Sequence, residues 1–543
     1  MLKLRGMHSL AMETLEQAKI EYADFSKDDF ILEIVKLKSN LTSLQHFLFD
    51  TGKETSLVKG DIYNPKQPEL FNEAEDLAAQ DKPEDISDED LSDVKPHRRR
   101  RGKRRLLSKD LPRHTEVNDI SDEEKVCKQH GTPLEKIGES SVEKLKLVPA
   151  KILVIERKTP KYKCPSCEEE EGKAEIISAP NPVDIIPKSF ATPELLAYIV
   201  SSKYEDHLPL YRQEKIFMRY GVDLTRTTMA RWMIQCADTA TPLINLMNED
   251  VVSRPVIHID ETVLQVLKEA GRKPQQKSFI WVYGANDEKP FVCFRYYSTR
   301  SKVAAGEILD EFEGIVVCDA YKAYDAVAKG RDFTLAACLA HVRRKFFLAE
   351  KDAKKAKVPS KKILASQAMA FIRKLYKIER ETKHKSPEER LTERKEKSLP
   401  ILTDFHVWLV EQSAKIIPKS SLGKAISYTL GIWDKLQVFI TDGRVSIDNN
   451  WVEALIRNFV IGRNNWTFSN TPKGAEASAT LYTLVESAKL NGLSPFDYLS
   501  VIFKELPRAK SLDDYEKLLP YNINKHYHIA PYLSPHNKAT PTT

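Results

Sequence analysis

The feature that most constrains the fold is a series of short apolar runs between residues 254 and 347. The runs "PVIHID", "FIWVYGA" and "FVCFRYY" have the β-branched and aromatic content of strands, and "NDEKP" between the last two is typical of a turn. "KVAAGEILDEF" is helical, "GIVVCDAYKAYD" begins as a further strand, and "FTLAACLAHVRRKFF" leads from a strand into a basic helix. This order of strand, hairpin, helix, strand, helix or loop, and strand predicts a mixed sheet.

Acidic residues end two of these predicted strands. Asp260 and Asp319 each follow an apolar strand, and they are 59 positions apart. In a mixed sheet whose first and fourth elements are neighbours, both carboxylates emerge at one edge. A helix crossing that edge would add Glu453, and Asp448 and Asn449 are suitable N-caps for that helix.

Three converging carboxylates repel one another, and the repulsion is costly unless metal ions neutralise it. Two Mg²⁺ ions about 4 Å apart are the usual arrangement for phosphoryl transfer. Oxygen ligands suit Mg²⁺ or Mn²⁺. The sequence therefore predicts a two-metal site made by Asp260, Asp319 and Glu453.

Three other acids compete for these roles. Glu261 neighbours Asp260, and adjacent strand residues point to opposite faces, so we expect Glu261 in a turn or outside the metal ligands. Asp325 follows the second strand by six residues, which is too far for a strand-end position. Glu486 lies in the apolar helix "LYTLVESAKLNG", where it either supports the site or is a buried polar group with its own partners.

The N-terminal part combines one amphipathic segment with a long charged segment. Residues 28–48 carry an apolar seam at heptad spacing, which predicts either a short coiled coil or one helix lying on a neighbouring domain. The seam is formed by Phe30, Ile34, Leu37, Leu41, Leu44 and Leu48. Residues 49–112 are expected to be a linker, with an acidic block followed by a basic block. That basic block is either a nucleic-acid-binding arm or a solvated tail, and it contains Arg98, Arg99, Arg100 and Arg101.

A small module is predicted at residues 121–185. Cys127 and His130 form one pair, Cys164 and Cys167 form a second, and two strands are expected between the pairs. Two such pairs at the ends of a strand pair are how a zinc ribbon collects four ligands, and a structural Zn²⁺ would stabilise a module with so little core. The alternative is two reduced cysteine pairs with an incidental histidine.

Residues 190–248 are predicted to be a helical DNA-binding region. "YGVD" separates two helical patterns, and Thr225 is a suitable N-cap for the second helix. Arg226 and Arg231 on that helix suit a helix-turn-helix, although short helical hairpins are common in all proteins. The core would then occupy residues 254–347 and 431–503, separated by a charged helical stretch at 348–430 and followed by a tail at 504–543.

Composition excludes several classes of protein. The chain has 543 residues and 41% hydrophobic residues, which is enough for packed cores, and no apolar run reaches the ~20 residues of a membrane span. The first residues lack the apolar segment of a signal peptide. Seven scattered cysteines argue against a disulfide framework. We therefore expect a soluble, intracellular protein with no membrane partner.

The sequence resembles the transposases of the insertion sequence 66 family, which belong to the DDE group with a ribonuclease H-like catalytic core. The resemblance runs from about residue 28 to 522. It rests on several motifs in order: "PKYKCPSC", "HIDETVLQVL", "VVCDAYKAY", "CLAHVRRKF", "PKSSLGKA", "DGRVSIDNNWVEALIRN" and "GRNNWTFSNTPKGAEASATLYTLVESAKLNGLSPFDYL". It implies a multidomain α+β protein whose ribonuclease H-like mixed sheet is interrupted by a helical insertion, after a coiled coil, a zinc-ribbon-like module and a helix-turn-helix.

The resemblance implies that Asp260, Asp319 and Glu453 form the DDE triad. The sequence departs from the family pattern at His130, which replaces a cysteine in the first zinc-ligand pair. Beside Glu453, Ala454 replaces an arginine and Leu455 replaces an alanine. Asn458 also replaces a proline.

Expected DNA contacts surround this triad. The basic helix after the last strand is expected to bind phosphate, with a solvated basic face as the alternative, and the other contacts combine cations with aromatic rings. These contacts are Lys322, Tyr324, His341, Arg343, Arg344, Lys345, Arg463 and Trp466.

The resulting expectation is a DNA transposase that cuts and joins strands at the ends of its element. Its partners would be double-stranded DNA, a second copy of the chain in a dimer or larger synaptic complex, and small companion proteins of the same element. The resemblance also implies a cytoplasmic bacterial protein that associates with the nucleoid when it binds DNA. The alternatives are a ribonuclease H-like nuclease and a DNA-binding relative that has lost catalysis.

Overall fold

The computed structural model describes residues 114–145, 151–163, 176–356 and 363–532, except residues 118, 127, 139, 141 and 143. The predicted coiled-coil segment (28–48) and the charged linker with its arginine block (49–112) lie outside the described residues. Cys127, Cys164 and Cys167 also lie outside them.

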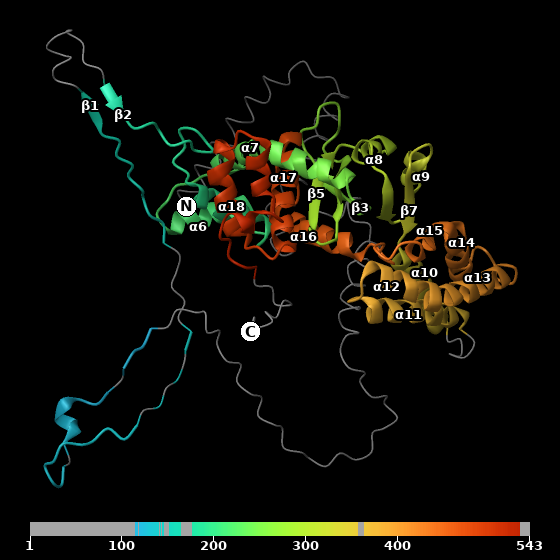
Figure 1. Ribbon diagram of the computed structural model, residues 1–543, viewed down its shortest axis with the longest axis horizontal. Coiled ribbons are helices and arrows are strands. Elements are labelled where there is room, and N and C mark those ends of the chain that lie inside the picture. The colour runs from blue at the N-terminus through green and yellow to red at the C-terminus, as the bar shows by residue number, and fades with distance from the viewer. Residues whose placement is uncertain are drawn as a thin grey trace, which may run out of the picture. The chain divides into compact units, whose positions relative to one another are not determined.

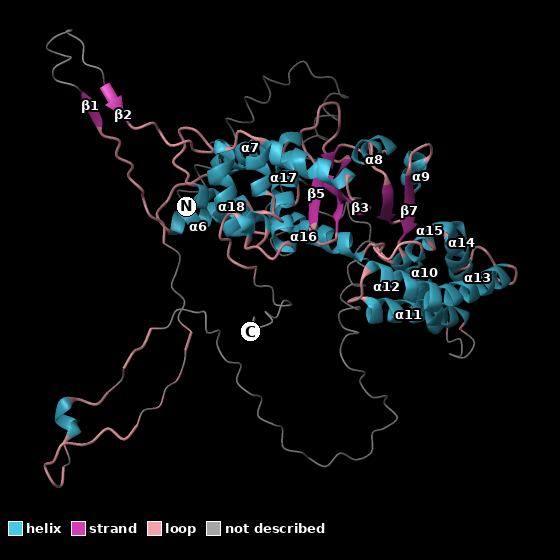
Figure 2. Cartoon of the chain, in the orientation of Figure 1, coloured by secondary structure: helices cyan, strands magenta, loops and turns pink. Residues whose placement is uncertain are grey.

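A five-stranded mixed sheet forms the centre of the main part of the chain (Figures 1 and 2). Its strand order is β5-β4-β3-β6-β7, so the prediction that the first and fourth strands are neighbours is confirmed. β3 to β5 form an antiparallel meander, whereas β6 and β7 run parallel to β3. The strands are β3 (Val256–Gln265), β4 (Lys277–Ala285), β5 (Phe291–Tyr297), β6 (Gly314–Cys318) and β7 (Phe333–Ala337).

A glycine allows β6 to begin close to β3. Gly314 has φ +145°, and a Cβ there would lie 2.6 Å from the carbonyl oxygen of Pro255. The next residue, Ile315, donates its backbone N–H to that oxygen at 3.0 Å. The pairing that follows aligns Val256 with Ile315 and His258 with Val317.

Two sets of helices pack with the sheet or with each other, one from the described chain before the sheet and one from the chain after the helical stretch that follows β7. The first set is α5 (Pro193–Tyr204), α6 (Leu210–Arg219) and α7 (Arg226–Val252), and the second is α16 (Asn450–Trp466), α17 (Pro472–Leu490) and α18 (Pro495–Glu505). α17 packs between β5 and α7, and most of its residues from Ala475 to Ala488 are buried, as expected for a helix that is apolar on all sides. α16 packs on β3 and β4.

The predicted N-cap of the second helix in the expected helix-turn-helix is confirmed. Thr225 Oγ1 accepts the backbone N–H of Thr228 at the start of α7, after a turn in which Gly221 has φ +78°. α7 extends for 27 residues, has buried residues from Met229 to Val251, and packs against α17 and α6.

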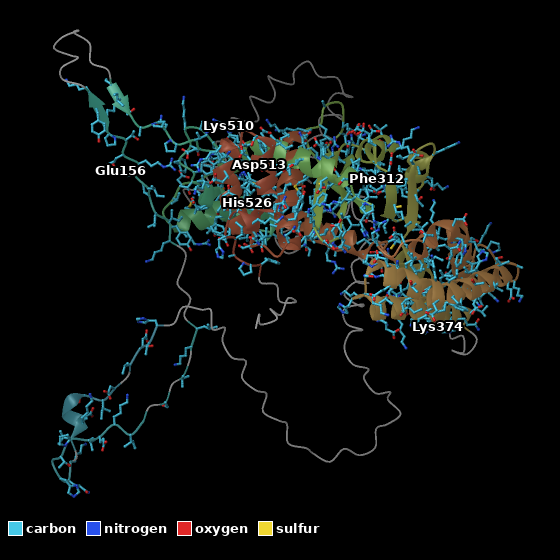
Figure 3. All side chains as sticks on the ribbon, viewed as in Figure 1. Glu156, Phe312, Lys374, Lys510, Asp513 and His526 are labelled. Atoms are coloured by element: carbon cyan, nitrogen blue, oxygen red, sulfur yellow. The ribbon has the colours of Figure 1, made fainter. Side chains whose placement is uncertain are left out.

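The described residues between β7 and α16 form helices joined by turns and loops and contain no strand. The helices are α10 (Leu339–Lys355), α11 (Leu364–Thr382), α12 (Pro387–Glu393), a π-helix η3 (Arg394–Ser398), α13 (Leu399–Ser413), α14 (Ser421–Gly431), α15 (Trp433–Leu436) and the 3₁₀ helix η4 (Val438–Ile440). α11 to α14 gather near the β7 end of the sheet (Figure 1). Figure 3 shows Lys374 of α11 on this helical part. One hydrophobic core runs from Val317 of β6 through Phe346 of α10 to Phe405 of α13, so the helical part is packed onto the sheet.

Residues 504–532 differ from the expected tail. They form η5 (Leu506–Arg508), α19 (Leu512–Leu518) and η6 (Ile523–Lys525), and Ile523 is fully buried. Tyr521 donates its hydroxyl to Asp250 of α7 at 2.6 Å.

Two shorter helices lie before and after β6 in the sequence, namely α8 (Lys302–Ile308) and α9 (Lys322–Ala328).

The predicted zinc module contains η1 (Asp122–Lys125), β1 (Lys161–Lys163) and β2 (Ile176–Ser178). β1 and β2 pair antiparallel across the segment that carries Cys164 and Cys167, and the described residues of 144–160 contain no strand. Among the described residues between the ligand pairs, β1 is the only strand, and its partner β2 follows the second pair. The described part of this segment therefore differs from the expected pair of strands. Around the first pair, Leu134 donates its N–H to Lys125 at 2.7 Å, which closes a tight reversal containing His130.

Among the described helices, none is both long and apolar enough to cross a membrane.

Candidate active site

The first two acids of the predicted triad lie level with each other on neighbouring strands. β3 and β6 pair in parallel up to His258 and Val317, and Asp260 and Asp319 each lie two residues further along. The sequence predicted that Asp260 ends its strand, but β3 continues to Gln265 in its pairing with β4. Asp260 lies instead where the pairing with β6 ends, so the two carboxylates still share one edge.

The third acid, Glu453, is brought to this edge by the first turn of α16. The residue that anchors this turn is Asn449, which is fully buried. Its side-chain amide donates to the carbonyl oxygen of Ile259 at 3.0 Å, and its Oδ1 lies 2.9 Å from Nδ1 of His258. Since the amide nitrogen faces Ile259, the oxygen must accept from His258.

The sequence predicted that Asn449 is an N-cap of α16, but its side chain makes no capping hydrogen bond with this helix. The Asn449 side chain binds β3 one residue before Asp260. Capping of the helix start falls to Asp448, whose Oδ1 accepts the N–H of Asn450 at 3.2 Å. Glu453 is one helical turn beyond Asn449, and its N–H donates to the Asn449 carbonyl oxygen at 3.2 Å.

The electrostatics of the cluster favour a bound cation. Burial, together with the carboxylates of Glu261, Asp319 and Glu453, raises the pKa of Asp260 well above its usual range. A carboxylate in this position is stabilised in its charged form by a positive ion. The donor set of three half-buried carboxylates is the one that Mg²⁺ or Mn²⁺ prefers.

Glu261 is held by its own partners. It accepts the Tyr324 hydroxyl at 2.9 Å and forms an ion pair with Arg300, while its side chain is only 1% exposed. Burial nevertheless raises the pKa of Glu261 to about 7, although Arg300 acts in the opposite direction. Arg300 Nη2 also lies 3.5 Å from Asp319, so one guanidinium links Glu261 to the cluster. The guanidinium stacks 3.9 Å from the centre of the Tyr321 ring.

The basic helix contributes one residue to the cluster. His341, in the first turn of α10, has its Nδ1 3.8 Å from Oε1 of Glu453. Cys338, which precedes α10, completes a group of three possible metal ligands whose atoms lie within 4.8 Å of one another. Burial lowers the pKa of His341, and Arg344 and Lys345 lower it further, while Asp319 opposes them.

The other expected DNA contacts divide into exposed and buried residues. Arg226, Arg231 and Lys322 are exposed. Lys345 lies 4.3 Å from the centre of the Tyr428 ring, and Arg343 and Arg344 are half-buried.

Arg463, Trp466 and Tyr324 point inward, contrary to expectation. Arg463 binds Thr262 and the Val263 carbonyl oxygen of β3, and burial lowers its pKa to about 10. The Trp466 ring packs edge-on against Phe459. The Tyr324 ring is fully buried. These three side chains therefore contact neighbouring parts of the fold.

Neither alternative acid joins the cluster. Asp325 is exposed and pairs with Lys435. Glu486 is buried, and it accepts from Asn458 at 3.0 Å and from Lys489 at 3.1 Å. Of the two interpretations of Glu486, the structure supports a buried polar group with its own partners, and one of those partners is the asparagine that departs from the family pattern.

Sequence reasoning missed three residues that shape the site: Asn449 as an anchor, Arg300, and Cys338. The spacing Cys338-x2-His341 at a strand-to-helix junction was a usable signal, since it places both side chains on one helical face. No comparable signal marks Arg300, which lies in a loop after β5.

Comparison with known proteins identifies the class as the transposases. The model of the family described as "Transposase IS66 family" matches residues 188–477, that of the "IS66 C-terminal element" matches 483–521, and that of the "zinc-finger binding domain of transposase IS66" matches 124–168. The chain belongs to the IS66 transposase family.

Three relatives come from Sinorhizobium fredii (strain NBRC 101917 / NGR234), and all are described as uncharacterized proteins. y4jD is 33% identical over 434 residues, which is 77% of this chain and 81% of the relative. y4qI is 33% identical over 401 residues, covering 71% and 72% of the two chains. y4hP is 32% identical over 406 residues, covering 72% of each.

Proposed function

We propose that the protein is the DNA transposase of an insertion sequence, which binds the ends of its element and cuts and joins DNA strands with Asp260, Asp319 and Glu453. The observation that carries the proposal is the level placement of the two aspartates on adjacent parallel strands, with a buried asparagine anchoring the helix of the glutamate beside them. Membership of the IS66 family supports it.

We assign the sheet to the ribonuclease H-like class. Its support is the order β5-β4-β3-β6-β7, in which an antiparallel meander continues into two parallel strands. The helical stretch between α10 and α16 is then an insertion between the second and third acids of the triad.

Asp260, Asp319 and Glu453 would hold two Mg²⁺ or Mn²⁺ ions. Bound there, the two ions would activate the attacking oxygen and stabilise the leaving oxygen of a phosphodiester. Asn449 keeps Glu453 at the strand edge, and Arg300 holds Glu261 beside Asp319. The reaction requires no covalent bond between protein and DNA, and thus no serine or tyrosine nucleophile.

DNA would be bound by regions outside the triad. The exposed Arg226, Arg231 and Lys322, together with Arg343 and Arg344, are proposed phosphate contacts near the core. Further contacts are proposed in the arginine block at residues 98–101. Because two element ends must be brought together, a dimer or larger assembly is expected, with companion proteins of the element as further partners.

The zinc-finger match supports a structural Zn²⁺ in the module at residues 121–185. We propose Cys127, His130, Cys164 and Cys167 as its ligands. His130 lies in the tight reversal closed by Leu134 and Lys125, which suits the first ligand pair.

A strand-transfer assay tests the proposal. The full chain would be incubated with Mg²⁺, a DNA fragment carrying the native element end and a target plasmid, together with the companion proteins. The wild type should join the fragment to the plasmid, and Asp319→Asn should abolish joining while leaving binding of the end intact. Asp325→Asn is the matched control, because Asp325 is an exposed acid six residues away that pairs with Lys435.

Each alternative predicts its own result in this assay. Cleavage that is indifferent to the element end and stops before joining would indicate a nuclease of this fold. Specific end binding without cleavage by the wild type would indicate a relative that has lost catalysis.

A further inference from the structure

We propose that His341 is a metal ligand beside Glu453, so that this half of the site binds a transition ion in preference to Mg²⁺. The inference rests on the proposed function, because Glu453 belongs to the proposed triad. It goes further in assigning to His341 a role other than contacting DNA phosphate.

The distance between the two side chains fits shared coordination and not a hydrogen bond. His341 Nδ1 and Glu453 Oε1 are 3.8 Å apart, beyond the range of a hydrogen bond. Two ligand atoms each about 2.1 Å from one ion stand about 3.0 to 4.2 Å apart, depending on the angle between them. The imidazole Nδ1 is buried and has no hydrogen-bond partner within the described part of the chain.

The two elements that carry these ligands are fixed to each other. Leu339 at the start of α10 donates its N–H to the carbonyl oxygen of Ile447 at 3.0 Å. Two residues later, the Asn449 N–H donates to Sγ of Cys338 at 3.2 Å. The start of α10 and the start of α16 are therefore held together by one backbone hydrogen bond and one contact from a backbone N–H to the Cys338 thiol. No large movement is needed to bring His341 and Glu453 to one ion.

The donor atoms determine which ion this half of the site prefers. Mg²⁺ demands oxygen ligands, whereas an imidazole nitrogen favours transition ions such as Mn²⁺, Co²⁺ and Zn²⁺. Cys338 Sγ, within 4.8 Å of both other donor atoms, adds a soft donor and makes the cluster still less suited to Mg²⁺. The Asp260 and Asp319 side of the site has only oxygen donors, so the two halves differ in chemistry.

Metal binding to the full chain tests the inference without measuring catalysis. The protein would be prepared with its zinc module loaded and then titrated separately with Mn²⁺, followed by electron paramagnetic resonance, and with Mg²⁺, followed by calorimetry. The wild type should bind Mn²⁺ more tightly than Mg²⁺. His341→Ala should weaken Mn²⁺ binding by about tenfold or more, because even the loss of a residue that only supports a metal ligand costs at least about tenfold. The variant should change Mg²⁺ binding far less.

A second variant keeps a ligand at this position and changes only its class. His341→Asp replaces nitrogen by oxygen, so Mg²⁺ binding should persist while the preference for Mn²⁺ falls. His384→Ala is the matched control, because it removes an exposed imidazole from the turn after α11. It should behave as the wild type does.

The outcomes separate this inference from the proposed function. If Asp319→Asn weakens metal binding but both His341 variants keep the wild-type ratio of Mn²⁺ to Mg²⁺ affinity, His341 is not a ligand and the proposed triad stands. If Asp319→Asn also leaves the binding of both ions unchanged, the metal site of the proposed function is wrong, and this inference is wrong with it.

Discussion

At the scale of single residues, Asn449 connects more parts of the site than its short side chain would suggest. It joins α16 to β3 through two side-chain contacts, at 2.9 and 3.0 Å, beside the carboxylates. Its backbone N–H contacts Cys338 at the start of α10. Three elements thus meet at one buried amide.

Asn449→Ala is expected to slow strand cleavage by about a hundredfold, because a displacement of about 1 Å in a catalytic group costs that much. The loss of buried hydrogen bonds should also lower the free energy of unfolding by about 1 to 3 kcal/mol. Cleavage rates and urea denaturation would measure the two effects. Asn464→Ala, at an exposed position late in the same helix, should change neither. Wild-type cleavage by Asn449→Ala would show that Glu453 is positioned without this anchor.

Lys203 offers a prediction about pH. It is 9% exposed, and burial lowers its pKa from 10.5 to about 8. Its ammonium group lies 5.0 Å from the centre of the Trp466 ring. Because the unfolded chain holds this proton more strongly than the folded chain, stability should rise as the pH increases from about 8 to 10.5.

Lys203→Met should therefore stabilise the protein at pH 7, by about 3 kcal/mol at most. The variant should also lose the rise in stability above pH 8 that Lys203 contributes. Urea denaturation at pH 7 and pH 9.5 would measure both, with Lys215→Met as the exposed control on α6. A variant that is less stable at pH 7 would mean that the contact with the Trp466 ring outweighs the cost of burial.

How much of the site could be predicted varies residue by residue. Asp260 and Asp319 were found because an acid after an apolar run is visible in the sequence itself. Arg463 and Trp466 were misjudged because the inward face of α16 depends on how that helix crosses β3, which no local pattern records. Glu486 could not be resolved beforehand, since its partners Asn458 and Lys489 are brought to it by the packing of α16 and by the turn of α17.

At the scale of elements, strands and helices were predicted better than their ends. The order of strands and the position of the Thr225 cap follow from local apolar patterns and polar residues. β3 extends beyond Asp260 through its pairing with β4, the next strand along the chain. The end of a strand thus depends on the partner it pairs with, which the apolar run itself does not record.

The helical part between β7 and α16 contains a buried ion pair, formed by Arg394 and Glu379. Arg394 is 1% exposed and makes two contacts with Glu379, at 2.9 and 2.6 Å, so it ties η3 to α11. It also donates to the carbonyl oxygens of Phe439 and Asp442, at 2.7 and 3.0 Å. One buried guanidinium therefore joins three segments.

Arg394→Met should lower the free energy of unfolding by about 3 to 5 kcal/mol, because it leaves the Glu379 carboxylate unpaired in the interior. The double variant Arg394→Met/Glu379→Leu should recover part of that loss, since no unpaired charge remains. Thermal unfolding of the two variants would show the difference. Equal losses in both would mean that the contacts to the carbonyl oxygens, and not the ion pair, carry the stability.

At the scale of the whole molecule, the predicted zinc module and the central sheet are separate structures. β1 and β2 form their own two-stranded sheet, which shares no strand with β3 to β7. Figure 3 shows Glu156 on the module and Phe312 beside the central sheet. Folding of one should therefore not require folding of the other.

Removing zinc with a chelator should abolish binding to element ends and leave unfolding of the central part unchanged. Calorimetry would follow unfolding, and a gel-shift assay would follow DNA binding. Cys164→Ser should reproduce the effect of the chelator, and Cys236→Ser, at a buried thiol of α7, provides a cysteine control outside the module. Retention of end binding by the chelated protein would place recognition elsewhere in the chain.

The position of Glu453 has a consequence for the chain while it is being made. Asp260 and Asp319 leave the ribosome early, but Glu453 follows Asp319 by 134 residues, and the whole helical part lies between them. At about 5 to 20 residues per second, that interval is roughly 7 to 27 seconds of synthesis. A nascent or prematurely terminated chain therefore carries two carboxylates without the third. Under the proposed function, such a chain would not yet be able to cut the chromosome beside it.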